Sequence, residues 1–251
     1  MSETTRTAGS PTVVLVHGAY ADASSWNGVI ERLQEAGVKV TAPANPLRGI
    51  SIDSDYISSY IRQIPGPVLA VGHSYGGAVI STAATDASNV VGLIFVAAFA
   101  PEEGESLGEI ESGSKDSVLN DAIVPIQYPN GDGTATEFAI DPAKFRDAFA
   151  ADLPPEQTAV MAATQRPVAE LAFSEPCGPP AWKSLPSWAV VATGDKAAGT
   201  DVVRSMAERA GATITEAEGS HVIMVSQPET VAGVIQTAVA TVERQPAVAR
   251  G

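Results

Sequence analysis

Short apolar runs alternate with stretches of helical periodicity along most of the chain. The first run, TVVLVH at 12–17, is rich in β-branched residues and ends at Gly18. An almost uninterrupted apolar run is typical of a strand that is buried on both faces of a parallel sheet. By the same criterion, further strands are predicted at 38–43, 68–72, 90–99, 188–193 and 212–218.

Helices are predicted between these strands because apolar residues recur there at three or four positions apart. In 26–36 they fall at Trp26, Val29, Ile30 and Leu33, and Gly37 ends the pattern. The other helices are predicted at 53–64, 75–85, 201–210 and 228–242. Strands that alternate with helices predict an α/β fold, with a mostly parallel central sheet and helices on both of its faces.

The alternation is lost between Pro101 and about Pro186. This stretch holds many prolines, glycines and acidic residues, and its helical patterns at 142–151 and 155–165 are short. Long irregular insertions in α/β folds are usually lids or binding loops, and ligands bind beyond the carboxyl ends of the strands. We therefore interpret the stretch as a lid over that edge of the sheet, inserted before the strand at 188–193.

A single α/β domain is the expected organisation, because no linker, charge block or repeat divides the chain. Its core is expected at about 11–100 and 187–245, its lid at about 101–186, and tails at 1–10 and 246–251.

The composition bears on the class of partner. With 29 acidic and 15 basic residues the formal net charge is −14, which opposes binding to nucleic acid or an anionic membrane. It favours a neutral small molecule as ligand, although acidity that serves only solubility explains the charge equally well.

Targeting and redox signals are few. The first residues, MSETTRTAGSP, lack the apolar region of a signal peptide, and no run of about 18 apolar residues suggests a membrane span. Cys177 is the single cysteine, so an internal disulfide and a cysteine-based metal site are excluded. A cytoplasmic protein, monomeric or homodimeric, is expected.

Ser74 is the strongest candidate for a nucleophile. It lies in VGHSYGGAVI, after a predicted strand and before a predicted helix, with glycines at 72, 76 and 77. This is the context of a nucleophile elbow, in which small residues let strand and helix approach while the serine hydroxyl is exposed on a strained turn. The alternative is a structural serine in a tight turn.

A serine nucleophile needs a base, and the chain has three histidines. His221 is the best placed, because it follows the last predicted strand on a loop that Gly219 and Ser220 introduce. His73 adjoins the serine, and neighbouring side chains on such a turn diverge. His17 ends the first strand, and we interpret it as a structural residue behind the site.

The base needs a carboxylate that orients it. Asp195 follows the strand at 188–193, so the order serine, acid, histidine along the chain is that of the α/β-hydrolase arrangement. Asp201 is better explained as a helix N-cap, and Glu216 and Glu218 share one face of their strand that is predicted to be solvated.

An oxyanion requires two convergent N–H donors. The Tyr75 amide, at the start of the helix that follows the serine, is one candidate. The Ala19 amide is the other, since Gly18 allows the backbone path that would direct it inward.

These motifs resemble the α/β-hydrolase superfamily, and within it the small serine esterases related to plant methylesterases and hydroxynitrile lyases. The matching segments are VLVHGAYADASSW, VGHSYGGAVI, VAAFAPEEGES, VATGDK and GSHVIMVSQPE. The resemblance implies a triad of Ser74, His221 and Asp195, an oxyanion hole from the Ala19 and Tyr75 amides, and no cofactor or metal.

Two positions place the chain on the esterase side of this resemblance. The lyases carry a threonine after the first-strand histidine and a lysine after the catalytic histidine, where this sequence has Gly18 and Val222. The sequence departs from the family after Asp195: it continues with KAAGT instead of an aliphatic residue and prolines.

The expected function is hydrolysis of carboxylic esters of small, largely apolar molecules through an acyl-enzyme. A lyase or cofactor-free perhydrolase with the same triad, and a non-catalytic small-ligand receptor, remain alternatives. Aromatic pairs at helical spacing, such as Phe145 and Phe149, are more often ordinary packing. The residues predicted to line the substrate pocket are Gly18, Tyr20, Phe99, Tyr128 and Val222.

Overall fold

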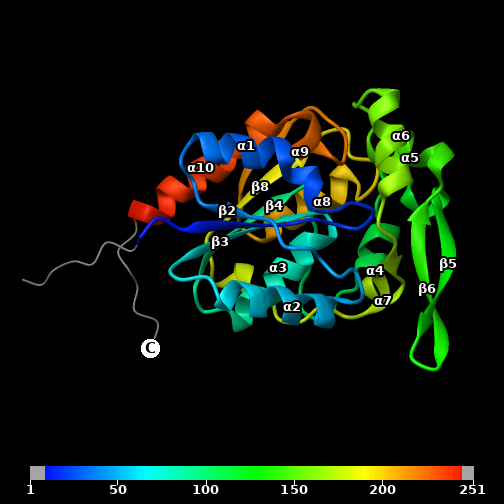
Figure 1. Ribbon diagram of the computed structural model, residues 1–251, viewed down its shortest axis with the longest axis horizontal. Helices are drawn as coiled ribbons and strands as arrows, with labels where there is room; N and C mark the ends of the chain where they lie inside the picture. The colour runs from blue at the N-terminus through cyan, green and yellow to red at the C-terminus, as the bar shows by residue number, and fades with distance from the viewer. Residues whose placement is uncertain (1–8, 245–251) are drawn as a thin grey trace, which may run out of the picture.

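A parallel six-stranded sheet forms the centre of the protein (Figure 1). The computed structural model describes residues 9–244, so the predicted tails lie outside the described residues except for residues 9 and 10. Along the sheet the strands follow the order β2-β1-β3-β4-β8-β9, and every pairing is parallel. Their bounds are β1 Thr12–Val16, β2 Val40–Thr41, β3 Val68–His73, β4 Val90–Val96, β8 Ser187–Ala192 and β9 Thr213–Ala217.

The predicted α/β class and all six predicted strands are confirmed, with one strand much shorter than expected. The strand predicted at 38–43 is reduced to the two residues of β2, which pairs with β1 alone at the edge of the sheet. An edge strand has one neighbour, so its length depends on that single pairing.

Helices cover both faces of the sheet. On one face α1 (Asn27–Glu35) packs against α10 (Pro228–Arg244), and on the other α2 (Ile50–Arg62) packs against α3 (Tyr75–Asp86) (Figure 1). The remaining core helix, α8 (Thr200–Arg209), packs on β8 and β9. Short helices precede α1 and α10: η1 (Ala23–Trp26) and α9 (Ile223–Ser226).

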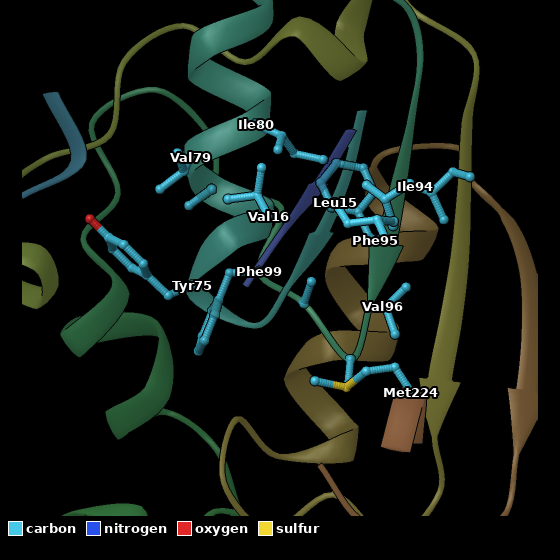
Figure 2. Packing of buried hydrophobic residues seen from close by; sticks show 14 of the residues in the cluster. Leu15, Val16, Tyr75, Val79, Ile80, Ile94, Phe95, Val96, Phe99 and Met224 are labelled. Atoms are coloured by element: carbon cyan, nitrogen blue, oxygen red, sulfur yellow. The ribbon is translucent and has the colours of Figure 1, made fainter. Parts of the chain in front are cut away.

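The hydrophobic core lies between the sheet and these helices. Figure 2 shows side chains of β1, β4 and α3 packed together, among them Leu15, Phe95 and Ile80. These three are at most 1% exposed. Burying a side chain of this size stabilises the fold by about 1.5–3 kcal/mol, so the core holds the strand ends in fixed positions.

Residues 101–186, the lid, contribute no strand to the central sheet within the described part of the chain. The lid projects from one end of the sheet, at the right of Figure 1. Its elements are α4 Leu107–Ser112, η2 Leu119–Asp121, β5 Ile123–Asn130, β6 Gly133–Ile140, α5 Pro142–Phe149, α6 Pro155–Thr164, β7 Val168–Ala169, α7 Leu171–Ser174 and η3 Ala181–Lys183.

The helices predicted at 142–151 and 155–165 are present as α5 and α6, whereas the antiparallel sheet β5-β6-β7 was not expected. Pro125 and Pro129 within β5 obscure its strand pattern, because proline lacks the N–H that a ladder needs. As β5 is an edge strand that pairs with β6 alone, it tolerates both prolines.

Candidate active site

Ser74 lies on a sharp turn between β3 and α3. Its φ of 54° and ψ of −125° are unusual for a residue other than glycine. The turn is held by its backbone: the Ser74 amide donates to the carbonyl of Val96, and the Ser74 carbonyl accepts from the Phe99 amide at 3.1 Å. Strand, strained turn and helix thus follow one another as the sequence predicts for a nucleophile elbow.

Close approach of the backbones around this turn leaves no room for side chains at Gly72 and Gly76. A Cβ on Gly72 would lie 2.5 Å from the backbone of Gly76, and one on Gly76 would lie 2.5 Å from the carbonyl oxygen of Val16. Real Cβ atoms do not approach backbone so closely, so glycine at these positions is a steric requirement of the elbow.

His221 and Asp195 form a buried hydrogen-bonded pair. The His221 Nδ1–H donates to Asp195 Oδ2 at 2.8 Å, and both side chains are 1% exposed. The other carboxylate oxygen, Oδ1, accepts from the amides of Ala197 at 2.9 Å and Ala198 at 3.1 Å. The carboxylate is therefore fixed on both oxygens, and the imidazole keeps Nε2 available as an acceptor.

The other acidic residues near these strand ends have different environments. Asp201 was predicted to be a helix N-cap, and this was wrong: Gly199 precedes α8, and Asp201 instead accepts from Ser114 Oγ at 2.5 Å and the Lys115 amide at 2.8 Å. The Asp201 carboxylate therefore binds lid residues and does not cap the helix. Glu216 and Glu218 are exposed as predicted, and Glu216 pairs with Arg204.

Ser74 and His221 line the same enclosed cavity, of about 10 Å³. No hydrogen bond joins them within the described residues, which is common for catalytic groups in the absence of substrate. The remaining lining residues are Ala19, Tyr20, Phe99, Leu119, Phe149, Phe173, Ala197 and Ala198. The cavity is therefore almost entirely apolar apart from the serine, the histidine and the tyrosine.

Backbone N–H groups are available beside the serine. Tyr75 is the first residue of α3, where amides have no partner within the helix. Within residues 9–244 neither the Tyr75 amide nor the Ala19 amide donates a hydrogen bond. The Tyr75 side chain points into the core, where its hydroxyl donates to the buried Asp53 at 2.8 Å. Only the backbone of Tyr75 is thus available to the site.

Of the five predicted pocket residues, Tyr20 and Phe99 line the cavity. Gly18 lies against it, since a Cβ there would be 2.7 Å from the Cβ of Ser74, and Val222 is buried beside His221. The prediction for Tyr128 was wrong. It lies on β5, in a separate groove, where its ring stacks on Arg48 at 4.6 Å. The hairpin carries it away from the strand ends, and the sequence did not predict that hairpin.

The lid side chains at the cavity were not among the predicted site residues. Phe149, at the end of α5, packs its ring 5.1 Å from that of His221, and Phe173 comes from α7. The helical spacing of Phe145 and Phe149 was interpreted as ordinary packing. The aromatic residues that face the site are selected by how the lid packs on the core. The local sequence pattern therefore does not distinguish them from other lid aromatics.

Tyr20 lines both the enclosed cavity and a larger outer groove. The groove, of about 350 Å³, is lined by residues 20–22, 24 and 25 on one side and by α6 with Gln165 on the other, and Val225 completes it. The Tyr20 hydroxyl is buried and has no hydrogen-bond partner within the described residues. A buried hydroxyl without a partner is costly, which marks Tyr20 as a side chain that a ligand could engage or displace.

His17 has a structural role, as predicted. It is fully buried; its Nε2 accepts from the Asn45 amide at 2.9 Å, and its Nδ1–H donates to the Gly18 carbonyl. The imidazole is therefore neutral, and burial lowers its pKa from 6.5 to about 4.

Because His17 is buried as a neutral imidazole, the folded protein is expected to lose stability in mild acid. The unfolded chain takes up a proton on His17 below pH 6.5, while the folded chain does so only near pH 4, so the folded state loses stability as the pH falls through this window. The contribution of His17 is about 1.4 kcal/mol per pH unit. Urea unfolding at pH 7 and pH 5 should show a smaller acid loss for His17→Gln than for the unmodified chain; parallel losses would contradict the assignment.

His73 has no carboxylate among its hydrogen-bond partners within the described residues. It is fully buried, and its Nε2–H donates to the backbone carbonyl of His221 at 3.0 Å. Burial, reinforced by the neighbouring His221, keeps its pKa well below the ordinary value. The side chain thus supports the loop that carries His221.

Among residues 9–244, no three side chains of the histidine, cysteine, aspartate and glutamate types gather in a way that could hold a metal ion. In the same range, no helix has the length and apolar character needed to cross a membrane.

Comparisons with known proteins agree with this geometry. Residues 13–234 match the family model described as "Alpha/beta hydrolase family". A carbendazim hydrolyzing esterase from Nocardioides sp. (strain SG-4G) is 34% identical over 107 residues, which are 38% of this chain and 44% of that esterase. The match therefore spans less than half the length of the relative.

Solved structures with the same fold include three enzymes at about one-fifth identity. Polyneuridine aldehyde esterase has a TM-score of 0.75 at 22% identity, over 91% of this chain and 99% of its own. A pyrethroid hydrolase from Sphingobium faniae JZ-2 has a TM-score of 0.74 at 20% identity, over 92% and 97%. Tomato methylketone synthase I, in complex with 2-tridecanone, has a TM-score of 0.73 at 22% identity, over 92% and 98%.

The family match covers most of the chain, and the parallel sheet and the serine on its strained strand-to-helix turn are features of the same fold. The chain belongs to the α/β-hydrolase family.

Proposed function

We propose that the protein hydrolyses carboxylic esters of small, largely apolar molecules, with Ser74 as nucleophile, His221 as base and Asp195 as its orienting acid. The observation that carries the proposal is the buried His221–Asp195 hydrogen bond of 2.8 Å in contact with the cavity that also holds Ser74. The family relationship and the esterase relatives support it.

In the first step the Ser74 hydroxyl attacks the ester carbonyl while His221 Nε2 takes its proton. The Asp195 carboxylate stabilises the imidazolium that forms and keeps its Nδ1–H directed away from the serine. The tetrahedral oxyanion would be held by the free amides of Ala19 and Tyr75, at the positive end of α3. His221 then gives its proton to the departing alkoxide.

In the second step water hydrolyses the acyl-enzyme. His221 removes a proton from the water, the resulting hydroxide attacks the acyl carbonyl, and collapse of the second tetrahedral intermediate returns the proton to Ser74. No step needs a cofactor or metal.

The steric environment of Gly18 favours hydrolysis over cyanohydrin cleavage. Lyases of the related branch carry a threonine at this position, but any Cβ here would lie 2.7 Å from the Cβ of Ser74 and 2.8 Å from the carbonyl oxygen of His73. The elbow would have to shift to admit a threonine side chain.

The cavity volumes limit the substrate. At about 10 Å³ the enclosed cavity has room for about one water molecule, so an ester enters only when Tyr20 or the lid gives way. We assign a small acyl group of the ester to this apolar cavity and the alcohol part to the outer groove of about 350 Å³ beside Tyr20.

A fluorophosphonate probe and a series of nitrophenyl esters test this proposal. The probe should label the purified protein at Ser74, as located by peptide mass, and should not label Ser74→Ala. Nitrophenyl acetate and butyrate should be turned over, and kcat/KM should fall at least about tenfold between butyrate and octanoate as the acyl group outgrows the cavity. Labelling that persists in Ser74→Ala, or no turnover of any short ester, would refute the assignment.

A further inference from the structure

The lid segment 114–118 is hydrogen-bonded to the loop that carries Asp195. The Val118 amide donates to the Lys196 carbonyl at 2.8 Å, and Ser117 Oγ donates to the Ala197 carbonyl at 2.6 Å. Further along the loop, Asp201 accepts from Ser114 and Lys115, as described above. The lid therefore holds the acid loop at both of its ends.

Ser117 occupies the central position in this contact. The Ser117 hydroxyl has one proton and two acceptors within reach, the Ala197 carbonyl at 2.6 Å and Glu111 Oε1 at 3.1 Å, and the shorter contact takes the proton. Ser117 Oγ then has two lone pairs left. One accepts from the Leu119 amide at 3.2 Å, and the other faces Glu111 Oε1 at 3.1 Å. For Glu111 to satisfy this second lone pair, its carboxyl group must carry the proton.

Glu111 is suited to be that donor. It is on α4 and only 5% exposed, and burial raises its pKa from 4.5 to about 7. The Ser117 hydroxyl and, less strongly, His221 oppose this rise in pKa, and Tyr20, which also faces Glu111, is itself buried and neutral. At neutral pH and below, a protonated Glu111 can therefore donate to Ser117.

The hydrogen bonds continue to the catalytic pair. The Ala197 carbonyl that accepts from Ser117 belongs to the same peptide group as the Ala198 amide, which donates to Asp195 Oδ1 at 3.1 Å. Asp195 in turn accepts from His221 through its other oxygen. A continuous chain of hydrogen bonds thus runs from the lid helix α4 to the imidazole.

We propose that Glu111 and Ser117 are positioning residues, which hold the Ala197 peptide so that Asp195 keeps His221 in the orientation for proton transfer. The inference rests on the proposed function, because it assigns the role of these lid residues in the same triad. The loop after Asp195 reads KAAGT and contains no proline that would restrict its backbone. The hydrogen bonds from the lid restrict it instead.

The histidine loop is held by the lid in a similar way. The side chain of Asp152, which follows α5, accepts from the Ser220 amide at 2.9 Å. The lid therefore contacts both loops that carry the triad side chains Asp195 and His221. A change in lid packing would move both loops.

The test compares substitutions at Ser117 and Glu111 with a control on α4, the helix that carries Glu111. Ser117→Ala should lower kcat for nitrophenyl acetate by about 10-fold to 100-fold, the loss typical of an orienting hydrogen bond, with KM changed less than about twofold. Ser117→Thr, which keeps the hydroxyl, should stay within about threefold of the unmodified enzyme. Ser112→Ala is the control, because this exposed serine bonds only to the Gly108 carbonyl of its own helix.

A second pair of variants separates positioning from general stability. Glu111→Gln keeps a donor for Ser117 and should retain most of the activity, whereas Glu111→Leu should lose as much as Ser117→Ala. The far-downfield proton resonance of the His221 Nδ1–H should shift or broaden in Ser117→Ala and remain in Ser112→Ala. These Glu111 variants also keep the inference testable if Ser117→Ala does not fold.

The outcomes distinguish this inference from the proposed function. If the fluorophosphonate probe does not label Ser74 in the unmodified enzyme, the proposed function fails. If the probe labels it, and Ser117→Ala and Glu111→Leu match Ser112→Ala in kcat and in the resonance, the positioning role is overturned. It is also overturned if Ser117→Thr and Glu111→Gln fail to restore kcat.

Discussion

Replacing His221 by alanine is expected to lower kcat for ester hydrolysis by about 10⁴-fold to 10⁶-fold. His221 is the histidine that a carboxylate orients: Asp195 engages its Nδ1, which leaves Nε2 as the acceptor for the Ser74 proton. His17 has both ring nitrogens bonded to backbone groups, and His73 donates its Nε2–H to the His221 carbonyl. Steady-state turnover of nitrophenyl acetate measures the loss.

Combining this change with Ser74→Ala tests whether the two residues act as one unit. Groups that share one proton transfer are not additive, so the double variant should be no slower than the slower single variant within about threefold. Thermal unfolding of each variant serves as the control, because a triad substitution should leave the fold intact. If His221→Ala keeps more than about a tenth of the activity, another base is present, and the proposed mechanism is wrong.

Replacing Gly76 by alanine is expected to destabilise the protein by about 3 kcal/mol and to remove most of its activity. The added Cβ would lie 2.5 Å from the carbonyl oxygen of Val16 and 3.0 Å from that of His17. Both atoms belong to backbone at the end of β1, in the interior of the sheet, so α3 would have to move outward. This movement would displace Ser74 and the Tyr75 amide together.

Gly233 provides a matched control for this substitution. It lies within α10, and a Cβ there would meet no atom within 4 Å. Gly233→Ala should therefore stabilise the protein by about 0.5–1 kcal/mol through helix propensity and leave kcat unchanged. Urea unfolding measures both variants, and equal stabilities for the two would contradict the steric account of the elbow.

Most of the core was predictable because its signals are local. The apolar run of β1 and the helical spacing in α1 reflect the periods of strand and helix. Glycines around Ser74 reflect a steric requirement that lies within one turn of chain. The lid was less predictable, since the β5 strand pattern is obscured by Pro125 and Pro129, and the place of Tyr128 followed from that hairpin.

By itself the sequence determined the α/β class, the Ser74 turn, and the order in which Asp195 and His221 follow it along the chain. Only the tertiary structure decided that the lid residue Ser117, itself in contact with Glu111, hydrogen-bonds to the acid loop 80 residues further along the chain. The reason is physical. Periodicity and backbone sterics act over a few residues, whereas a hydrogen bond between distant segments forms only where packing brings its donor and acceptor together.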